Sequence, residues 1–491
     1  MTDLQSFLHN IGSLLTYSPD EPMLFSGGLF WALFICFMPL YALLRSRHTQ
    51  MVVFVIAFSL FFYYKSSGFF LLLLVATSVI DWYISRALTH VESRGGRRWL
   101  VALSVCVSLS VLCYFKYANF FLWNWNAMVE GNFQPLDIVL PLGISFYTFR
   151  SISYVVDVYR GKTGPAQTWG EYLFFLSFFP ALIAGPIVRA DCFLPQIREN
   201  HRADRDEIFG GLWLIICGVV KKAVVADYIA QYNDLIFDNP GGYTGFESLM
   251  GIIGYTMQIY CDFSGYSDMA IGIALIMGFR LGINFDRPYR SKSLTEFWHR
   301  WHISLSTWLR DYVYIPLGGN RKGTARTYVN NFLTMLIGGL WHGAAWKFVF
   351  WGGMHGIGLA VNKFCRPYTS RLDGKKWFDV LSLAATLVYV SLLWVFFRAP
   401  SFSDSVDIVA NIFTSFAPES IIPFFKTRWL WCVLMASISI THIVPQRWLE
   451  SAGSRFISSP WIVKLLIFLV VVQFVIEFEG EEVAPFIYYQ F

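Results

Sequence analysis

Long apolar stretches recur along the whole chain, and they restrict its fold more than any other feature. The hydrocarbon core of a bilayer is about 30 Å thick, so a spanning helix needs about 20 apolar residues. The stretches lie at residues 24–44, 51–64, 67–80, 99–122, 136–158, 171–188, 208–230, 245–283, 328–361, 377–397, 428–445 and 461–478. They predict an all-α polytopic membrane protein with about 10–12 transmembrane or re-entrant helices.

The composition excludes the other broad classes of protein. Of 491 residues, 55% are hydrophobic and only 14% are charged, against roughly 25% charged in a typical soluble domain. The apolar content excludes disorder, and eight cysteines without repeated spacing exclude a disulfide scaffold. We therefore predict a single integral membrane domain over residues 1–491. The net charge of +5 lies in local clusters between apolar stretches, which indicates membrane topology rather than nucleic-acid binding.

The distribution of Lys and Arg predicts how the chain is oriented. Residues 1–23 contain acids but no Lys or Arg, so this segment is expected to face outward. Arg45 lies in the first predicted cytosolic loop and Arg447 in the last. The aromatic tail at 479–491 should then face outward as well.

Residues 280–326 form a cationic region that is expected to be cytosolic or interfacial. It holds nine cations and three acids, with Trp298, Trp301 and Trp308 among them. Ser293 and Glu296 have the spacing of a capping box, which predicts a helix from there to about residue 315. On one continuous helix, residues 298, 302 and 306 would share a face.

The cationic region allows two interpretations. One is an interfacial helix in contact with membrane lipids, with Trp at the headgroups and Arg among the phosphates. The other is a cationic mouth that attracts a polyanionic donor such as an acyl-coenzyme A. For the second interpretation the candidate donor-binding residues are Arg300, Arg310, Trp298 and Asp311.

Histidines at membrane depth are the candidate catalytic groups. His342 lies inside an apolar run from residue 332 to 360, where an ionisable side chain usually faces a cavity or a partner. A buried imidazole stays neutral and can accept a proton; the alternative is a hydrogen-bonded core histidine. His355 falls roughly on the opposite helical face and is interpreted as core. No metal site is predicted, because no cysteine or carboxylate cluster accompanies the pair His299 and His302.

Other charged residues also interrupt apolar stretches. Asp262 or Asp268 is expected to pair with an arginine of the following segment, as a structural contact. Lys221, Lys222 and Arg150 are candidates either for donor contact or for snorkelling to the interface.

Several of these segments resemble the membrane-bound O-acyltransferases, MBOAT, and in particular the bacterial branch that acetylates alginate and related polysaccharides. The resemblance rests on residues 184–187, 258–268, 297–312, 314–320 and 341–343. It implies a many-helix fold around a tunnel through the membrane, with His342 as the catalytic histidine and His302 as its companion on the cytosolic side. It also implies acetyl-CoA or a similar acyl donor as substrate, with no bound cofactor.

The resemblance further implies a location and partners. The location is the bacterial cytoplasmic (inner) membrane, and the acceptor is an envelope polysaccharide. The chain shows no G-x-S-x-G elbow of its own, since residues 265–269 lack the last glycine. The acyl group is therefore expected to pass to an extracytoplasmic partner similar to a serine esterase.

The last residues suggest a carrier for the acyl group. Tyr488 lies in a short aromatic ending that resembles the ending of related proteins. Its phenol is a candidate transient acyl carrier that enters the tunnel from outside; the alternative is an interfacial aromatic anchor.

Three other functions remain open from the sequence. The acceptor could be peptidoglycan, teichoic acid, a lipid or a protein. A transporter or flippase would also have broken helices, although such proteins usually show internal repeats, which are not seen here. A non-catalytic scaffold would predict that His342→Ala is silent.

Overall fold

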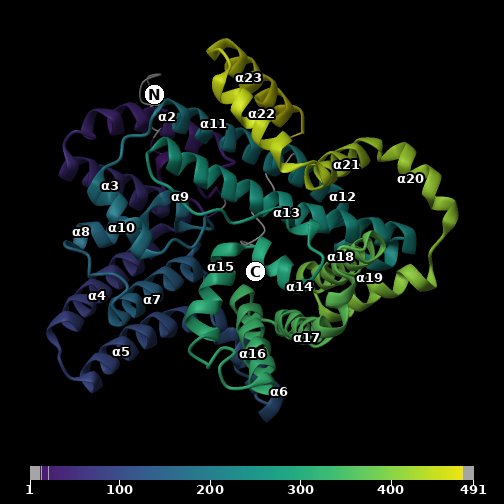
Figure 1. Ribbon diagram of the computed structural model, residues 1–491, viewed down its shortest axis with the longest axis horizontal. Coiled ribbons are helices and arrows are strands. Elements are labelled where there is room, and N and C mark those ends of the chain that lie inside the picture. Colours follow the sequence, from purple (N-terminus) through teal and green to yellow (C-terminus); the bar gives the residue numbers. More distant parts are fainter. Residues whose placement is uncertain (1–11, 13, 20, 479–491) are drawn as a thin grey trace. The chain divides into compact units, whose positions relative to one another are not determined.

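The computed structural model describes residues 12, 14–19 and 21–478, and this part of the chain forms helices and no strand (Figure 1). The predicted all-α class is confirmed. Two compact units result from the pattern of contacts between residues. The first unit is Met1–Asp204 with Met277–Leu281, and the second is Arg205–Ile276 with Gly282–Phe491.

Five helical segments of the described chain are long and apolar enough to cross a membrane, or up to seven if each of two bent helix pairs is one span. The five are His48–His90, Arg94–Val129, Arg205–Asp238, Lys376–Arg398 and Trp461–Phe478. The protein is thus an integral membrane protein with several spans, and the total of about 10–12 transmembrane or re-entrant helices stays a prediction.

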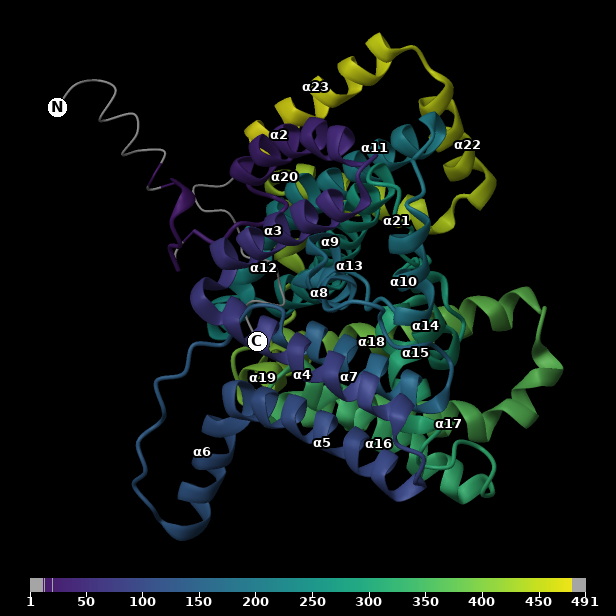
Figure 2. The same cartoon turned by 90° about the vertical axis from the view of Figure 1, so that its left-hand side faces the viewer.

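Among the described residues, the first unit contains the α-helices α2 to α10, with a short 3-10 helix at Gly68–Phe70 and a π-helix at Cys113–Tyr117. The α-helices are α2 (Gly28–Leu44), α3 (His48–Ser67), α4 (Leu71–His90), α5 (Arg94–Leu112), α6 (Ala118–Val129), α7 (Ile144–Arg160), α8 (Trp169–Ser177), α9 (Phe179–Leu182) and α10 (Ala190–Glu199). Figure 2 shows α4, α5 and α7 side by side.

Hydrogen bonds to one buried carboxylate connect four helices of this unit. Asp81 on α4 accepts from Ser104 on α5 (2.7 Å), Ser151 on α7 and Tyr172 on α8 (2.9 Å). Arg150 on α7 is also buried, and it donates to the backbone carbonyls of residues 175 and 182. A polar side chain inside an apolar unit is costly unless it is hydrogen-bonded, so these contacts make its burial possible.

The second unit contains the remaining helices. They are α11 (Arg205–Val219), α12 (Asp227–Asp238), α13 (Gly245–Ile276), α14 (Leu294–Arg300), α15 (Ile303–Leu309), α16 (Thr324–His342), α17 (Trp346–Thr369), α18 (Lys376–Arg398), α19 (Phe402–Thr414), α20 (Ile421–Thr427), α21 (Trp429–Ile443), α22 (Gln446–Ser458) and α23 (Trp461–Phe478).

Glycines bring α11 and α13 into close contact (Figure 1). A methyl group on Gly211 would lie 2.6 Å from the carbonyl oxygen of Gly272, and one on Gly218 would lie 2.6 Å from that of Gly265. The two glycines on α11 are seven residues apart, and so are the two on α13, so on each helix both glycines lie on the same face. Such small residues let membrane helices pack backbone against backbone.

Two adjacent lysines pair with carboxylates on α13. They lie on a π-helical stretch, Val220–Ala226, between α11 and α12. Lys221 is 2.6 Å from Asp268, and Lys222 is 2.6 Å from both Asp262 and Asp227. The predicted arginine partner of the α13 carboxylates is therefore wrong: lysines of the preceding segment fill this role, because the antiparallel packing of α11 and α13 places them opposite.

Replacing Lys222 should destabilise the protein strongly. The side chains of Lys222 and Asp262 are 4% and 5% exposed, so Lys222→Met would remove the cation that lies beside the buried Asp262 carboxylate. We expect a loss of about 3–5 kcal/mol, the usual result of removing one partner of a buried pair. The thermal unfolding of detergent-purified protein would measure this loss.

The matched control is Arg366→Gln, which breaks the exposed pair of Arg366 with Asp373. Such a pair contributes at most about 1 kcal/mol. Equal unfolding temperatures for the two variants would contradict the structural role given to Lys222.

Candidate active site

His302 lies at a break between two short helices. Ser293 caps α14 as predicted, with its hydroxyl accepting from the N–H of Glu296 at 3.1 Å. The helix then ends at Arg300, and His302 takes a left-handed conformation with φ of 43° before α15 begins. The prediction of one helix to about residue 315 is wrong, and so is the shared helical face of residues 298, 302 and 306.

A neighbouring loop explains the break. The N–H of Asp286 donates to the carbonyl of Arg300, and the N–H of Ile303 donates to the carbonyl of Asn284, both at 2.9 Å. These bonds occupy backbone groups on both sides of His302. These bonds join two segments that share no periodic pattern of residues. The sequence pattern therefore does not predict this contact.

The His302 imidazole is fully buried among aromatic rings. Its ring centre lies 4.6 Å from that of Phe263 on α13 and 6.0 Å from that of Trp341 on α16. This burial lowers the pKa of His302 to about 3, because an apolar environment disfavours the charged imidazolium. The imidazole is therefore neutral near pH 7.

His342 is the last residue of α16 and is 4% exposed. Residues 343–345 separate it from α17. The apolar run from 332 to 360 is therefore two helices. The prediction that His355 lies on the helical face opposite His342 is wrong, because the two residues are not on one helix. His355 lies on α17 and is fully buried.

Two tryptophans connect three of the buried histidines. The ring of Trp341 lies 6.0 Å from His302 and 5.0 Å from His342, between ring centres. The ring of Trp351 lies 5.1 Å from His342 and 4.6 Å from His355. The structure thus gathers His302, His342 and His355 in one aromatic cluster of the second unit. The full burial of His355 agrees with its interpretation as a core histidine. The sequence did not predict that Trp351 and His355 lie near His342, because only the packing of α16 on α17 brings them there.

Trp298 belongs to the same cluster. It is 8% exposed, and its ring lies 5.0 Å from His355 and 5.8 Å from Trp351. Trp301 and Trp308 are also buried. The interpretation of these tryptophans as headgroup anchors of an interfacial helix is therefore wrong, since they pack inside the unit.

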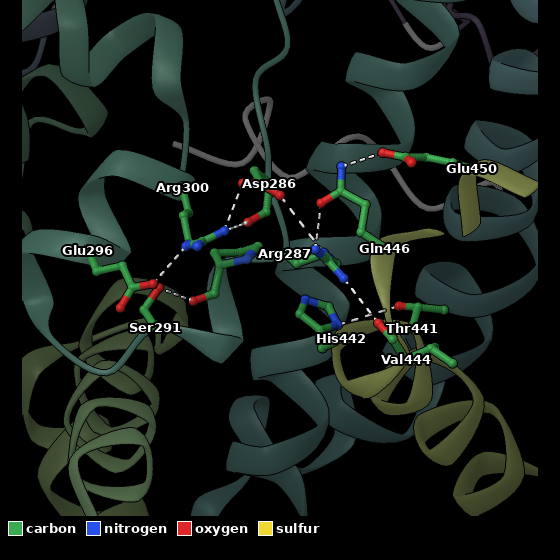
Figure 3. A network of polar contacts seen from close by, with 11 residues as sticks. Asp286, Arg287, Ser291, Glu296, Arg300, Thr441, His442, Val444, Gln446 and Glu450 are labelled. Atoms are coloured by element: carbon green, nitrogen blue, oxygen red, sulfur yellow. Dashed lines mark hydrogen bonds and ion pairs between the residues drawn. The ribbon is translucent and has the colours of Figure 1, made fainter. Parts of the chain in front are cut away.

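The cations of residues 280–326 differ in their surroundings. Arg300 donates to Asp286 at 2.7 Å and to Glu296 at 3.0 Å (Figure 3). Arg287, beside it in Figure 3, donates to the backbone carbonyl of residue 444. Arg310 is 60% exposed and pairs with the adjacent Asp311 at 2.8 Å. Arg300 is thus held by two carboxylates within the fold, whereas Arg310 presents its side chain to the surroundings.

Close packing of α16 on α17 holds His342 against Trp351. A methyl group on Gly352 would overlap the carbonyl oxygen of Met335 and lie 3.0 Å from the Cα of Gly339. At Gly353, by contrast, the nearest atom would be 3.7 Å away, on the ring of Phe332. Backbone contact at Gly352 therefore sets the distance between the two helices.

The variants Gly352→Ala and Gly353→Ala should differ although the positions are adjacent. We expect Gly352→Ala to cost about 1–3 kcal/mol by overpacking and to separate His342 from Trp351. Gly353→Ala should be neutral, because its methyl group meets ordinary contact distances and alanine favours helix. Thermal unfolding and acyl transfer by both purified variants would test this, and equal behaviour would contradict it.

The fold and the site define a polytopic helical membrane protein with a buried cluster of histidine and tryptophan. A family model for MBOAT, the membrane-bound O-acyltransferase family, matches residues 100–398, which include the whole cluster. The chain belongs to this family. It is therefore an integral membrane O-acyltransferase.

Three relatives illustrate the range of the family. The chain is 43% identical to the probable alginate O-acetylase AlgI of Pseudomonas aeruginosa, over 77% of this chain and 72% of that one. It is 36% identical to the peptidoglycan O-acetyltransferase of Helicobacter pylori, over 69% of both chains. It is 26% identical to the teichoic acid D-alanyltransferase of Bacillus subtilis, over 57% of this chain and 74% of that one.

One predicted site residue, Tyr488, lies outside the residues that the structure describes.

Proposed function

We propose that this protein takes an acetyl group from a cytosolic acyl-CoA-type donor and moves it across the bacterial inner membrane for O-acetylation of a cell-envelope polysaccharide. The observation that carries the proposal is the buried His302–Trp341–His342 contact inside the family match. The 43% identity to a probable alginate O-acetylase supports acetyl as the group and a polysaccharide as the acceptor.

His342 is the proposed general base. A hydroxyl is a poor nucleophile until a base removes its proton, and a positioned imidazole contributes roughly 10²–10⁴-fold to the rate. As the hydroxyl oxygen bonds to the acyl carbon, the carbon–sulfur bond of the thioester breaks. The proton passes through His342 to the departing thiolate. His302, held neutral by burial, assists from the neighbouring position.

Among the candidate donor-binding residues, Arg310 is the best placed to bind the phosphates of the acyl-CoA-type donor, because its guanidinium is exposed. Asp311 orients Arg310 through their ion pair. Arg300 and Trp298 are proposed to shape the site from within the fold, since one is held by two carboxylates and the other is buried.

The transferred group is proposed to reach the polysaccharide through an extracytoplasmic acetyltransferase similar to a serine esterase. Peptidoglycan is the second candidate acceptor, favoured by the 36% identity to a peptidoglycan O-acetyltransferase. O-acetyl measured separately on secreted polysaccharide and on purified peptidoglycan would distinguish the two acceptors.

The histidine assignment can be tested in cells that lack the protein. Complementation with wild type should restore envelope O-acetyl, and His342→Ala should lower it by about 10²-fold or more, because the general base is lost. The measurement is alkali-released acetate at equal membrane abundance. His299→Ala is the control, since the side chain of His299 is exposed. Full restoration by His342→Ala would refute the assignment.

The proposed carrier role of Tyr488 can be tested by removing a single atom. Tyr488→Phe removes only the phenol oxygen that would form the acyl ester, so we expect O-acetyl to be lost although the aromatic ring remains. Tyr489→Phe, one residue on, should keep transfer. If Tyr488→Phe and a chain without residues 486–491 both transfer normally, the tail is an anchor and no carrier.

A further inference from the structure

We propose that Asn284 is a positioning residue that fixes the imidazole of His302 as the Nδ1–H tautomer, so that Nε2 is the nitrogen that accepts a proton. The inference rests on the proposed function in one respect, the participation of His302 in transfer. The tautomer itself follows from the hydrogen bonds of the loop described above.

Three polar atoms converge on the side-chain oxygen of Asn284, which is 1% exposed. The backbone N–H of Ser304 lies 3.2 Å from Oδ1, the Ser304 hydroxyl 2.9 Å, and Nδ1 of His302 3.2 Å. All three belong to the residues around the break that separates α14 from α15.

The backbone N–H determines the orientation of the amide. Asparagine oxygen and nitrogen are interchangeable in shape, so their assignment depends on the hydrogen-bond partners. The N–H of Ser304 can only donate. The amide atom facing it must therefore be the oxygen, since the opposite orientation would place two donors against each other.

The tautomer of His302 follows from this orientation. An amide oxygen only accepts, and a neutral imidazole has one donor nitrogen and one acceptor nitrogen. If Nδ1 of His302 carried the lone pair, two acceptors would face each other at 3.2 Å. Nδ1 therefore carries the hydrogen, and the lone pair is on Nε2.

Helix α13 supports both members of this pair. Ser267 is 3.2 Å from the Asn284 amide nitrogen, which donates to its hydroxyl. Phe263, four residues earlier and so on the same face of α13, packs against the His302 ring at 4.6 Å. The amide and the ring are thus held by one surface, and neither can rotate without losing its contact there.

Magic-angle-spinning NMR of protein labelled with ¹⁵N-histidine in lipid vesicles would test the proposal. The chain has nine histidines, and the difference from the spectrum of His302→Gln identifies the His302 signals. The expected wild-type spectrum shows a protonated Nδ1 and an unprotonated Nε2. A protonated Nε2 in the wild type would overturn the proposal without any variant of Asn284.

Two variants of Asn284 separate positioning from simple support of the loop. Asn284→Asp keeps an oxygen acceptor and should keep the Nδ1–H tautomer. Asn284→Ala should give a mixture of tautomers and lower kcat by about tenfold or more, the size of effect seen when a metal-bound histidine loses the partner that orients it, with little change in KM. An unchanged tautomer in Asn284→Ala would overturn the positioning role.

The same measurements distinguish this inference from the proposed function. The tautomer is observed in resting protein without donor or acceptor. A wild-type Nδ1–H tautomer together with full transfer by His302→Gln would support the orientation by Asn284 and refute the assistance by His302.

Discussion

The backbone hydrogen bonds between residues 284–286 and the break after α14 determine the geometry on which the candidate site depends. A helix end leaves N–H and C=O groups unpaired, and inside an apolar unit each such group is costly. Asp286 and Asn284 bond to backbone groups on both sides of His302. Because these groups are satisfied from outside the helix, the chain can leave α14, turn at a left-handed residue and direct an imidazole toward α13.

The same constraint explains the buried charges elsewhere in the chain. Asp81 in the first unit accepts three hydroxyl hydrogen bonds, and Lys222 in the second lies between two carboxylates. In both cases the polar group joins several helices. A buried ion pair gives little net stability, so its effect is to specify which helices meet. Around the site, this fixes the register of α11 on α13, the helix that carries Phe263 and Ser267.

The sequence predicted the features that depend on a local pattern of residues. The apolar stretches indicated a polytopic helical protein, the Ser293 cap was correct, and His342 was singled out by its apolar surroundings. The sequence did not predict the features that depend on contacts between segments distant in the chain. The break at His302 depends on Asn284, and the place of His355 depends on the end of α16 at His342. A helical wheel assumes one continuous helix, and this assumption gave the wrong face relations at His302 and between His342 and His355, although His355 is buried in the core as predicted.

The aromatic surroundings of His342 bear on the proposed proton transfer. An imidazolium in an apolar environment lacks the stabilisation of water, so a base buried there must hold its proton briefly. The rings of Trp341 and Trp351 lie nearly perpendicular to that of His342, at interplanar angles of 77° and 84°. Perpendicular aromatic rings attract each other because the positive edge of one meets the negative face of the other, and a desolvated cation that meets the face of a tryptophan gains about 2 kcal/mol. An indole face that meets the edge of His342 would thus offset part of the cost of the charge that the proposed reaction creates.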